Sequence, residues 1–223
     1  MSFPTCHIVG VFVGGPKTLR DDRGEWRSSI ARDRVHGAAQ LELRGFGGDQ
    51  VTQPYHGSLE TAVCLHSLTH YLFWNSTLRM ALQPGAVGEN LTFDVADDSN
   101  VCVGDVLRIG TARLQISAPR TPCENQARHI GRTDWVKRTI AALRTGMYAR
   151  VLVPGALQVG DSVVLEARPN PGLTVYALNH CYYHDYQPEM VERFCAAEGL
   201  MEWWKQRLRA GAPNRAAHGK DRL

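Results

Sequence analysis

The sequence predicts a mainly β protein, with a barrel-like or sandwich-like core and a small helical appendage near its C-terminal end. From residue 7 to residue 165, short apolar alternations are separated by Gly-rich turns, a pattern typical of barrels and sandwiches. After the Pro- and Gly-rich segment at 167–173, the apolar spacing changes to a helical period. The length of 223 residues fits one core of about 150 residues plus an appendage better than two full domains.

The expected strands are short and are bounded by turn residues. They are HIVGVFV (7–13), AQLEL (39–43), TAVCLH (61–66), VCVGDVLRIG (101–110), ARLQIS (112–117), ARVLV (149–153) and DSVVLEA (161–167). The tripeptide VGD occurs at 103–105 and at 159–161, each time before an apolar alternation. We expect two equivalent tight turns there, in which Gly adopts a positive φ and Asp caps the turn.

Two helices are expected to interrupt the core, at 66–78 and at 133–143, the second beginning at Thr133 or Asp134. Beyond the linker, three apolar stripes at helical spacing predict three more helices within about 40 residues, which is few for independent folding. They are expected to dock on the core or on a second subunit, which would make the protein a homodimer. The chain is therefore divided into a core at 1–168, a three-helix domain at 172–211 and a basic tail at 212–223, expected to be disordered.

The charge distribution and the spacing of the cysteines indicate a reducing compartment and no nucleic-acid partner. Residues 205–223 carry a net charge of +5 and the rest of the chain −2. A basic tail without interleaved aromatic residues is more typical of a solvated end than of a nucleic-acid interface. The six cysteines are irregularly spaced without a C-x-x-C pair, and neither a secretory signal nor an apolar run of about 18–20 residues is visible. We expect a cytoplasmic protein without a membrane span.

Cys123, in the stretch SAPRTPCENQ (117–126), is the leading candidate for chemistry. Pro119 and Pro122 cannot donate ladder hydrogen bonds, so they end the preceding strand and fix the backbone that aims the thiol. The peptide amides after Pro122 are expected to open a helical turn, and both they and Arg120 would favour a thiolate. The alternative is a small buried hydrophobe, which is the common state of a cysteine; the other five cysteines are interpreted in that way.

Two Gly-rich segments, GFGGDQ (45–50) and YHGS (55–58), indicate tight turns or backbone brought close to a ligand. Neither is a dinucleotide fingerprint, because no strand–turn–helix context surrounds it. His56 in the second segment is a better ligand or acid candidate than a helical histidine. His66 and His70, expected at i and i+4 on one helix face, could bind a metal, but without an intervening glutamate a packed or solvated pair is favoured.

Three further polar residues have both a structural and a functional interpretation. Glu89 and Asn90 follow a Gly-containing turn in the segment GEN (88–90) and are either turn formers or binding residues. Arg150 precedes an apolar run and is either solvated or faces an anion.

Taken in order, these motifs resemble the MOSC domain, named for its place at the C-terminus of molybdenum-cofactor sulfurases. The motifs are GGD (47–49), HG (56–57), GEN (88–90), VGD (103–105), PRTPC (119–123) and GMYARVLVPG (146–155). The stand-alone YiiM-like branch is the closer match, because its core is also followed by a three-helix domain. One loop departs from the family pattern: it reads HGSLE (56–60) where a second glycine is expected.

The resemblance implies a β-barrel-like fold and a molybdenum cofactor of the molybdopterin type, with Cys123 as the molybdenum ligand. It implies that Arg120 and Arg150 pair with the cofactor phosphate or a substrate oxyanion and that His56 donates a proton. The remaining cofactor-binding positions that it implies are Gly48, Asp49, Gly57, Glu89 and Asn90.

The activity implied by the resemblance is reduction of N-hydroxylated compounds, including hydroxylaminopurine-type base analogues, to amines. Electrons would come from an external reductase, because the sequence has no flavin or iron–sulfur motif. Two alternatives stay open: a sulfur carrier with a persulfide on Cys123, and a cofactor-binding or delivery protein without turnover.

Overall fold

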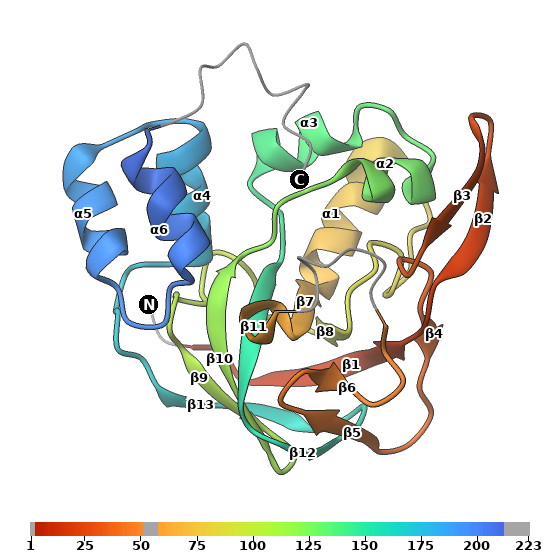
Figure 1. Ribbon diagram of the computed structural model, residues 1–223, viewed down its shortest axis with the longest axis horizontal. Helices are drawn as coiled ribbons and strands as arrows, with labels where there is room; N and C mark the ends of the chain where they lie inside the picture. Colours follow the sequence, from red (N-terminus) through yellow and green to blue (C-terminus); the bar gives the residue numbers. More distant parts are fainter. Residues whose placement is uncertain (1–2, 51–57, 212–223) are drawn as a thin grey trace.

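The computed structural model describes residues 3–50 and 58–211, and its centre is a closed barrel of seven strands (Figure 1). In barrel order the strands are β13 (Ser162–Ala167), β9 (Val106–Ile109), β10 (Ala112–Pro119), β11 (Met147–Val153), β7 (Val63–Ser67), β8 (Leu91–Phe93) and β1 (Cys6–Val13). Pairing of Cys6 with Val163 and of His7 with Ser162 closes the ring. Closure removes the exposed sheet edges that open β proteins must protect. The predicted mainly β, barrel-like fold is confirmed.

Every pairing in the barrel is antiparallel except that between β7 and β8. Parallel neighbours need a long crossover, and α1 (Leu68–Leu78) lies within it. The inward side chains form one apolar core of mostly β-branched and leucine residues, as the alternation in the sequence predicts. On the outside, β4 (Asp33–Arg34) extends β1, and β5 (Ala39–Glu42), β6 (Gly45–Phe46) and β12 (Gly155–Leu157) form a separate small sheet.

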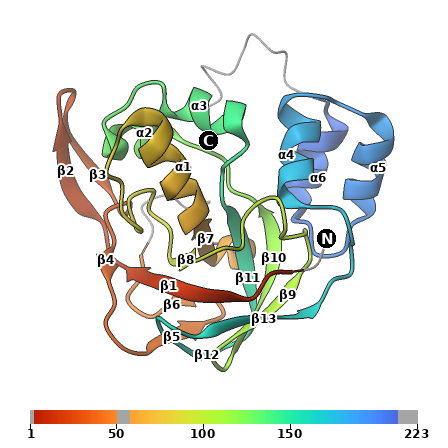
Figure 2. The same ribbon diagram turned by 180° about the vertical axis from the view of Figure 1, so that it is seen from behind.

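A hairpin of β2 (Lys17–Asp21) and β3 (Gly24–Ser28) projects from the barrel towards α2 (Glu124–Ile130) (Figures 1 and 2). Asp21 accepts two hydrogen bonds from Arg128 of α2, at 2.6 and 2.7 Å, and the Arg128 guanidinium lies over the Trp26 ring. The hairpin is therefore fastened to the helix that follows Cys123.

The two VGD turns have the predicted conformation. Gly104 has φ +81° and Gly160 has φ +94°. In each turn the aspartate accepts the amide N–H three residues earlier, at 2.9 Å: Asp105 from Cys102 and Asp161 from Gln158. These bonds confirm that the turns are equivalent and that the aspartates cap them.

The expected helix at 66–78 is wrong at its start, because strand β7 continues to Ser67 and α1 begins at Leu68. Ser67 is the N-cap, and its hydroxyl accepts the Thr69 N–H at 3.2 Å, which ends the strand and starts the helix. His66 is therefore a strand residue, and it does not share a helix face with His70. The helix expected at 133–143 is α3 (Trp135–Ala142), with Asp134 at its N-cap.

Three short helices, α4 (Val175–Tyr183), α5 (Pro188–Ala196) and α6 (Glu202–Arg209), form a group beside the ends of β10 and β11 (Figures 1 and 2). Their apolar core includes Val103 of the first VGD turn and Ala118 of β10, so the three helices pack directly against the barrel. The turn at Gly104 packs closely against this group, because a Cβ there would clash with the Glu198 carbonyl oxygen. In the described part of the chain, no helix is long and apolar enough to span a membrane.

Candidate functional site

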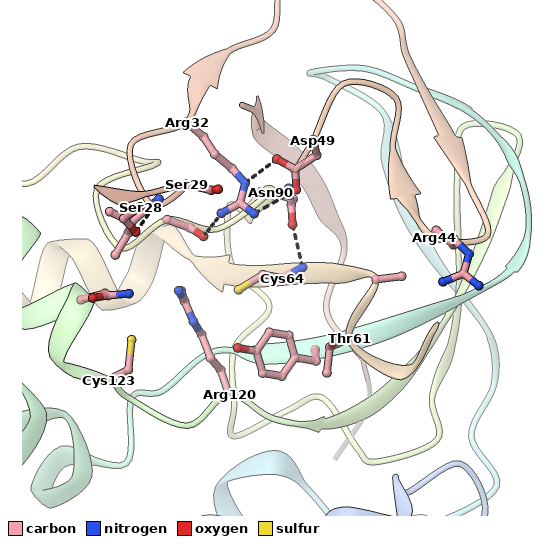
Figure 3. A pocket seen from close by; sticks show the side chains of 15 residues that line it. Ser28, Ser29, Arg32, Arg44, Asp49, Thr61, Cys64, Asn90, Arg120 and Cys123 are labelled. Atoms are coloured by element: carbon pink, nitrogen blue, oxygen red, sulfur yellow. Dashed lines mark hydrogen bonds and ion pairs between the residues drawn. The ribbon is translucent and has the colours of Figure 1, made fainter. Parts of the chain in front are cut away.

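A polar pocket opens where β10 ends and α2 begins, next to the base of the β2–β3 hairpin (Figure 3). Its lining combines two thiols with three arginines and several neutral polar groups. The lining residues are Ser28, Ser29, Ile30, Arg32, Arg44, Asp49, Thr61, Ala62, Cys64, Gly88, Asn90, Arg120, Cys123, Asn125 and Tyr148. Four of the residues predicted for the site, Asp49, Asn90, Arg120 and Cys123, therefore meet in one pocket. His56 and Gly57 lie outside the described residues.

Cys123 is the N-cap residue of α2 and lines the pocket with a half-buried thiol. Its backbone is extended, with φ −134° and ψ 164°, and its carbonyl accepts the N–H groups of Gln126 and Ala127. The thiol itself caps nothing. The prediction that the amides after Pro122 open a helical turn is confirmed, and the sulfur is left available to the pocket.

Arg120 is the buried cation of the pocket. It is only 7% exposed, and within residues 3–50 and 58–211 no carboxylate lies in ion-pair contact with it. The amide of Gln126, with its oxygen turned towards Arg120, accepts hydrogen bonds from the guanidinium at 3.1 Å. Burial acts to lower the pKa of Arg120, but the neighbouring Cys64, Tyr148, Cys123 and Glu89 groups together outweigh it, and the pKa is raised. A buried charge normally has an opposite charge beside it, so this guanidinium is suited to an anionic ligand.

Asp49 and Asn90 belong to a hydrogen-bond network that builds one wall of the pocket. Asp49 accepts both Nε and Nη2 of Arg32, at 2.8 and 2.9 Å, and the Gly14 N–H at 3.0 Å. Asn90 donates to Asp49 at 3.0 Å and accepts the Cys64 N–H at 3.0 Å. The Arg32–Asp49 pair is electrically neutral, so it adds no net charge beside Arg120.

Glu89 lies behind this wall and outside the pocket lining. Its fully buried carboxylate accepts the Tyr71 hydroxyl at 2.7 Å, the Gly85 N–H at 2.7 Å and the Thr92 hydroxyl at 2.8 Å. Burial, reinforced by Glu89, raises the pKa of Tyr71 well above its ordinary value, so the phenol stays a donor. The structure gives Glu89 a bracing role between α1 and β8.

Arg150 and Gly48 also lie outside the lining. Arg150 donates to Gln115 at 2.8 Å and to Glu60 at 3.0 Å. Gly48 has φ +82°, which places Asp49 after a turn that other residues adopt with strain. Whether either residue contacts a ligand stays a prediction.

The structure adds a residue that the sequence interpretation assigned to the core, Cys64. Its thiol is 6% exposed and lines the pocket, and burial raises its pKa, opposed by Arg120 and Arg32. The β11–β7 register pairs Tyr148 with Cys64, so both reach the pocket from adjacent strands. The apolar run TAVCL contains no signal for this position. Ser28, Ser29 and Arg32 were also missed, because only the folded hairpin brings them here.

His66 and His70 contribute to a buried polar cluster next to the pocket. Their ring centroids are 4.8 Å apart, and His70 Nε2 lies 3.3 Å from Asp98 Oδ2. Burial lowers the pKa of both histidines and raises that of Asp98. Among the residues described, no group of three His, Cys, Asp or Glu side chains has an arrangement that could hold a metal ion.

The fold and the pocket define a β-barrel protein with a thiol and a buried, unpaired guanidinium at one site. The family model of the MOSC domain matches residues 52–164. The chain is 34% identical to the uncharacterized protein YflK of Bacillus subtilis (strain 168) over 200 residues, or 89% of this chain and 90% of YflK. The chain therefore belongs to the MOSC domain family, and the resemblance inferred from the motifs is confirmed.

Two further likenesses bear on the fold and the activity. The crystal structure of YiiM from Geobacillus stearothermophilus superposes with a TM-score of 0.78 at 26% identity, covering 92% of this chain and 98% of YiiM. A protein of Gibberella moniliformis (strain M3125 / FGSC 7600) named a reductase is 34% identical over 156 residues. That match covers 68% of this chain but 28% of the reductase.

Proposed function

We propose that this protein is a molybdenum-cofactor-binding oxidoreductase that reduces N-hydroxylated compounds to amines, hydroxylaminopurine-type base analogues among them. The observation that carries the proposal is that one pocket contains the half-buried thiol of Cys123 and the buried, unpaired guanidinium of Arg120. Membership of the MOSC family and the likeness to a fungal protein named a reductase support it.

The donor set of the pocket fits this cofactor. A thiolate is a suitable ligand for a soft metal, and a guanidinium offers forked donors to a phosphate. Ser29 adds a buried hydroxyl oxygen without a hydrogen-bond partner in the described chain, and Asn125 adds an amide at the same lining. Cys123 would hold the metal, Arg120 the anionic end, and Ser29 and Asn125 the polar edges between them.

The polar groups of Asp49, Asn90 and Glu89 are already engaged within the protein. We infer that their part is to fix the pocket wall and that Arg120, Ser29 and Asn125 make the direct contacts. His56 keeps its proposed role of proton donor.

The proposed reaction consumes two electrons and two protons for each N–O bond broken, and it releases the amine and one water. The bound cofactor supplies the two-electron chemistry. An external reductase returns the electrons. A cytoplasmic location belongs to the same proposal and is supported by the six cysteines, all of which are free thiols.

The proposal is tested by turnover of the purified full chain, made in a host competent for the cofactor. Amine formation from a hydroxylaminopurine, driven by a chemical reductant, is expected to scale with molybdenum content across preparations. If the molybdenum-loaded protein forms no amine, the proposed reductase activity is wrong and a cofactor-binding or delivery protein is indicated instead. Cyanide-labile sulfur on Cys123 without molybdenum would support the sulfur-carrier alternative instead.

A further inference from the structure

We propose that the three-helix group α4–α6 is the support that positions the pocket arginine, with Trp204 and Asn179 as positioning residues. The inference concerns the pocket itself, and it stands whether or not the ligand is the one proposed above. It assigns a role in the site to helices that do not line it.

The first attachment reaches the residue directly before Arg120. Trp204 of α6 is 1% exposed, and its indole Nε1–H donates to the Pro119 carbonyl at 3.2 Å. The Met201 N–H, at the start of the same helix, donates to the Ser117 carbonyl at 2.9 Å. Two carbonyls at the end of β10 thus take their partners from the three-helix group.

The second attachment reaches the segment that pairs with Arg120. The Arg120 N–H donates to the Gly146 carbonyl at 3.0 Å. The neighbouring Thr145 accepts the amide of Asn179, a fully buried residue of α4, at 2.8 Å. Asp98 fixes the same turn by accepting the N–H groups of Thr145 and Gly146, each at 3.2 Å.

Asp98 ties this turn to α4 a second time, because its own carbonyl accepts the Tyr176 N–H at 2.7 Å. The backbone on both sides of the Arg120–Gly146 hydrogen bond is therefore bonded to the three-helix group. Figure 1 shows α4 and α6 beside the ends of β10 and β11.

Arg120 needs this support because the free-energy cost of burying its charge is offset only when the guanidinium is oriented to donate hydrogen bonds to its partners. Within the described chain those partners are neutral, the side-chain amide of Gln126 and the hydroxyl of Tyr148. Displacement of Pro119 or Gly146 would move the charge away from Cys123, since side-chain direction follows the backbone that carries it. Loosening the three-helix group is therefore expected to weaken the positive field at Cys123.

The field is measurable on the full chain purified from a host without the cofactor. Cys123 is alkylated in parallel with iodoacetate, an anion, and iodoacetamide, which is neutral, and the rates are obtained by peptide mass mapping. The ratio of the two rates reports positive charge at the thiol. A general loosening raises both rates alike and leaves the ratio unchanged.

Arg120→Met calibrates the assay and is expected to lower the ratio about three- to fivefold, as removal of one nearby charge predicts. Trp204→Phe keeps an aromatic ring but loses the N–H and part of the buried indole volume, and it is expected to lower the ratio by at least half of that effect. Trp203→Phe, on the adjacent position of α6, is the matched control and should match the wild type. A wild-type ratio in Trp204→Phe, or no effect of Arg120→Met, overturns the inference.

If Trp204→Phe does not fold, Asn179→Ala decides the question. It removes the α4 amide that donates to Thr145 and leaves the hydrogen bonds of the Thr145 hydroxyl to Asp98 and to the Gly146 carbonyl in place. A lowered ratio supports the inference, and an unchanged ratio contradicts it. Because no cofactor is present, the result is independent of the proposed function.

Discussion

The buried pair His70–Asp98 leads to a prediction about how the stability of the protein depends on pH. The pKa values of the two residues are shifted in opposite directions, so their contributions to the free energy of unfolding offset each other. His70 Nε2 and Asp98 Oδ2 are 3.3 Å apart, and both side chains are almost fully buried. Burial lowers the pKa of His70 from 6.5 to about 3 and raises that of Asp98 from 3.8 to about 7. The charges facing them are Asp97, which acts to raise the pKa of His70 and of Asp98, and Arg144, which acts to lower that of His70.

The signs of the two contributions are opposite. Between pH 3 and 6.5 the unfolded chain binds more protons at His70 than the folded one, so the His70 contribution to stability falls as the pH falls. Between pH 4 and 7 the folded chain binds more protons at Asp98, so the Asp98 contribution rises as the pH falls. From pH 8 to pH 5 each contribution amounts to about 2–3 kcal/mol, and because their signs are opposite they offset each other in the wild type.

Asp98→Asn should remove the Asp98 contribution to the pH dependence of stability while keeping the hydrogen bonds of this side chain. The amide oxygen can still accept from Thr145 and Gly146, and its NH₂ can donate to His70. Relative to the wild type, the free energy of unfolding of Asp98→Asn should fall by about 2–3 kcal/mol between pH 8 and pH 5. Urea titrations at several pH values measure this difference, and His70→Gln should change in the opposite direction. Parallel pH profiles for Asp98→Asn and wild type would refute the reasoning.

Three further predictions concern stability. Glu89→Gln turns an amide donor towards the donors Tyr71 and Thr92, and it should cost about 2–4 kcal/mol in urea unfolding; an unchanged midpoint would show that Glu89 is not a brace. Asp49→Asn leaves Arg32 buried without its pair and should cost about 3 kcal/mol, whereas Asp33→Asn, which breaks an exposed pair with Lys17, should cost less than about 1 kcal/mol; equal losses would contradict the burial argument. Deletion of residues 212–223 should leave the thermal midpoint unchanged, and loss of soluble folding would disprove the prediction that this tail is dispensable.

Local rules predicted much of the fold. The apolar alternation located most barrel strands, and the VGD turns followed from the conformations that Gly and Asp favour. The same rules predicted the backbone direction at Cys123, because two prolines precede it and a helix starts directly after it. These features depend on residues close in sequence, and a single sequence contains that information.

The β2–β3 hairpin could not be predicted in this way. Its residues KTLRD and GEWRS present partly exposed side chains on both faces, so no apolar period marks it. Long-range contacts to α2 hold it instead, chiefly Arg128 with Asp21 and Trp26. The pocket residues at its base, Ser28 and Ser29, were missed for the same reason.

Cys64 and Glu89 show which features of the pocket could not be predicted from the sequence alone. A cysteine in an apolar strand looks like core, and only the pairing of β7 with β11 shows that Cys64 shares a pocket with Tyr148. Glu89 lies in the same short motif as Asn90, but its donors come from α1, the preceding turn and β8, and it lies outside the pocket lining. Whether Glu89 contacts a ligand stays a prediction. The sequence supplied the candidate residues, but it could not separate pocket lining from pocket support.

The claim that Cys123 is the molybdenum ligand of this pocket is tested most directly by elemental analysis. Wild type, Cys123→Ser and Cys195→Ser are purified from a host competent for the cofactor, and molybdenum is measured per chain. Cys195 is the matched control, since it is the other half-buried thiol and lies in α5, outside the pocket lining. Wild type and Cys195→Ser should carry near-equimolar molybdenum, and Cys123→Ser should lose most of it. Equal molybdenum in all three proteins, or none in the wild type, would contradict the claim.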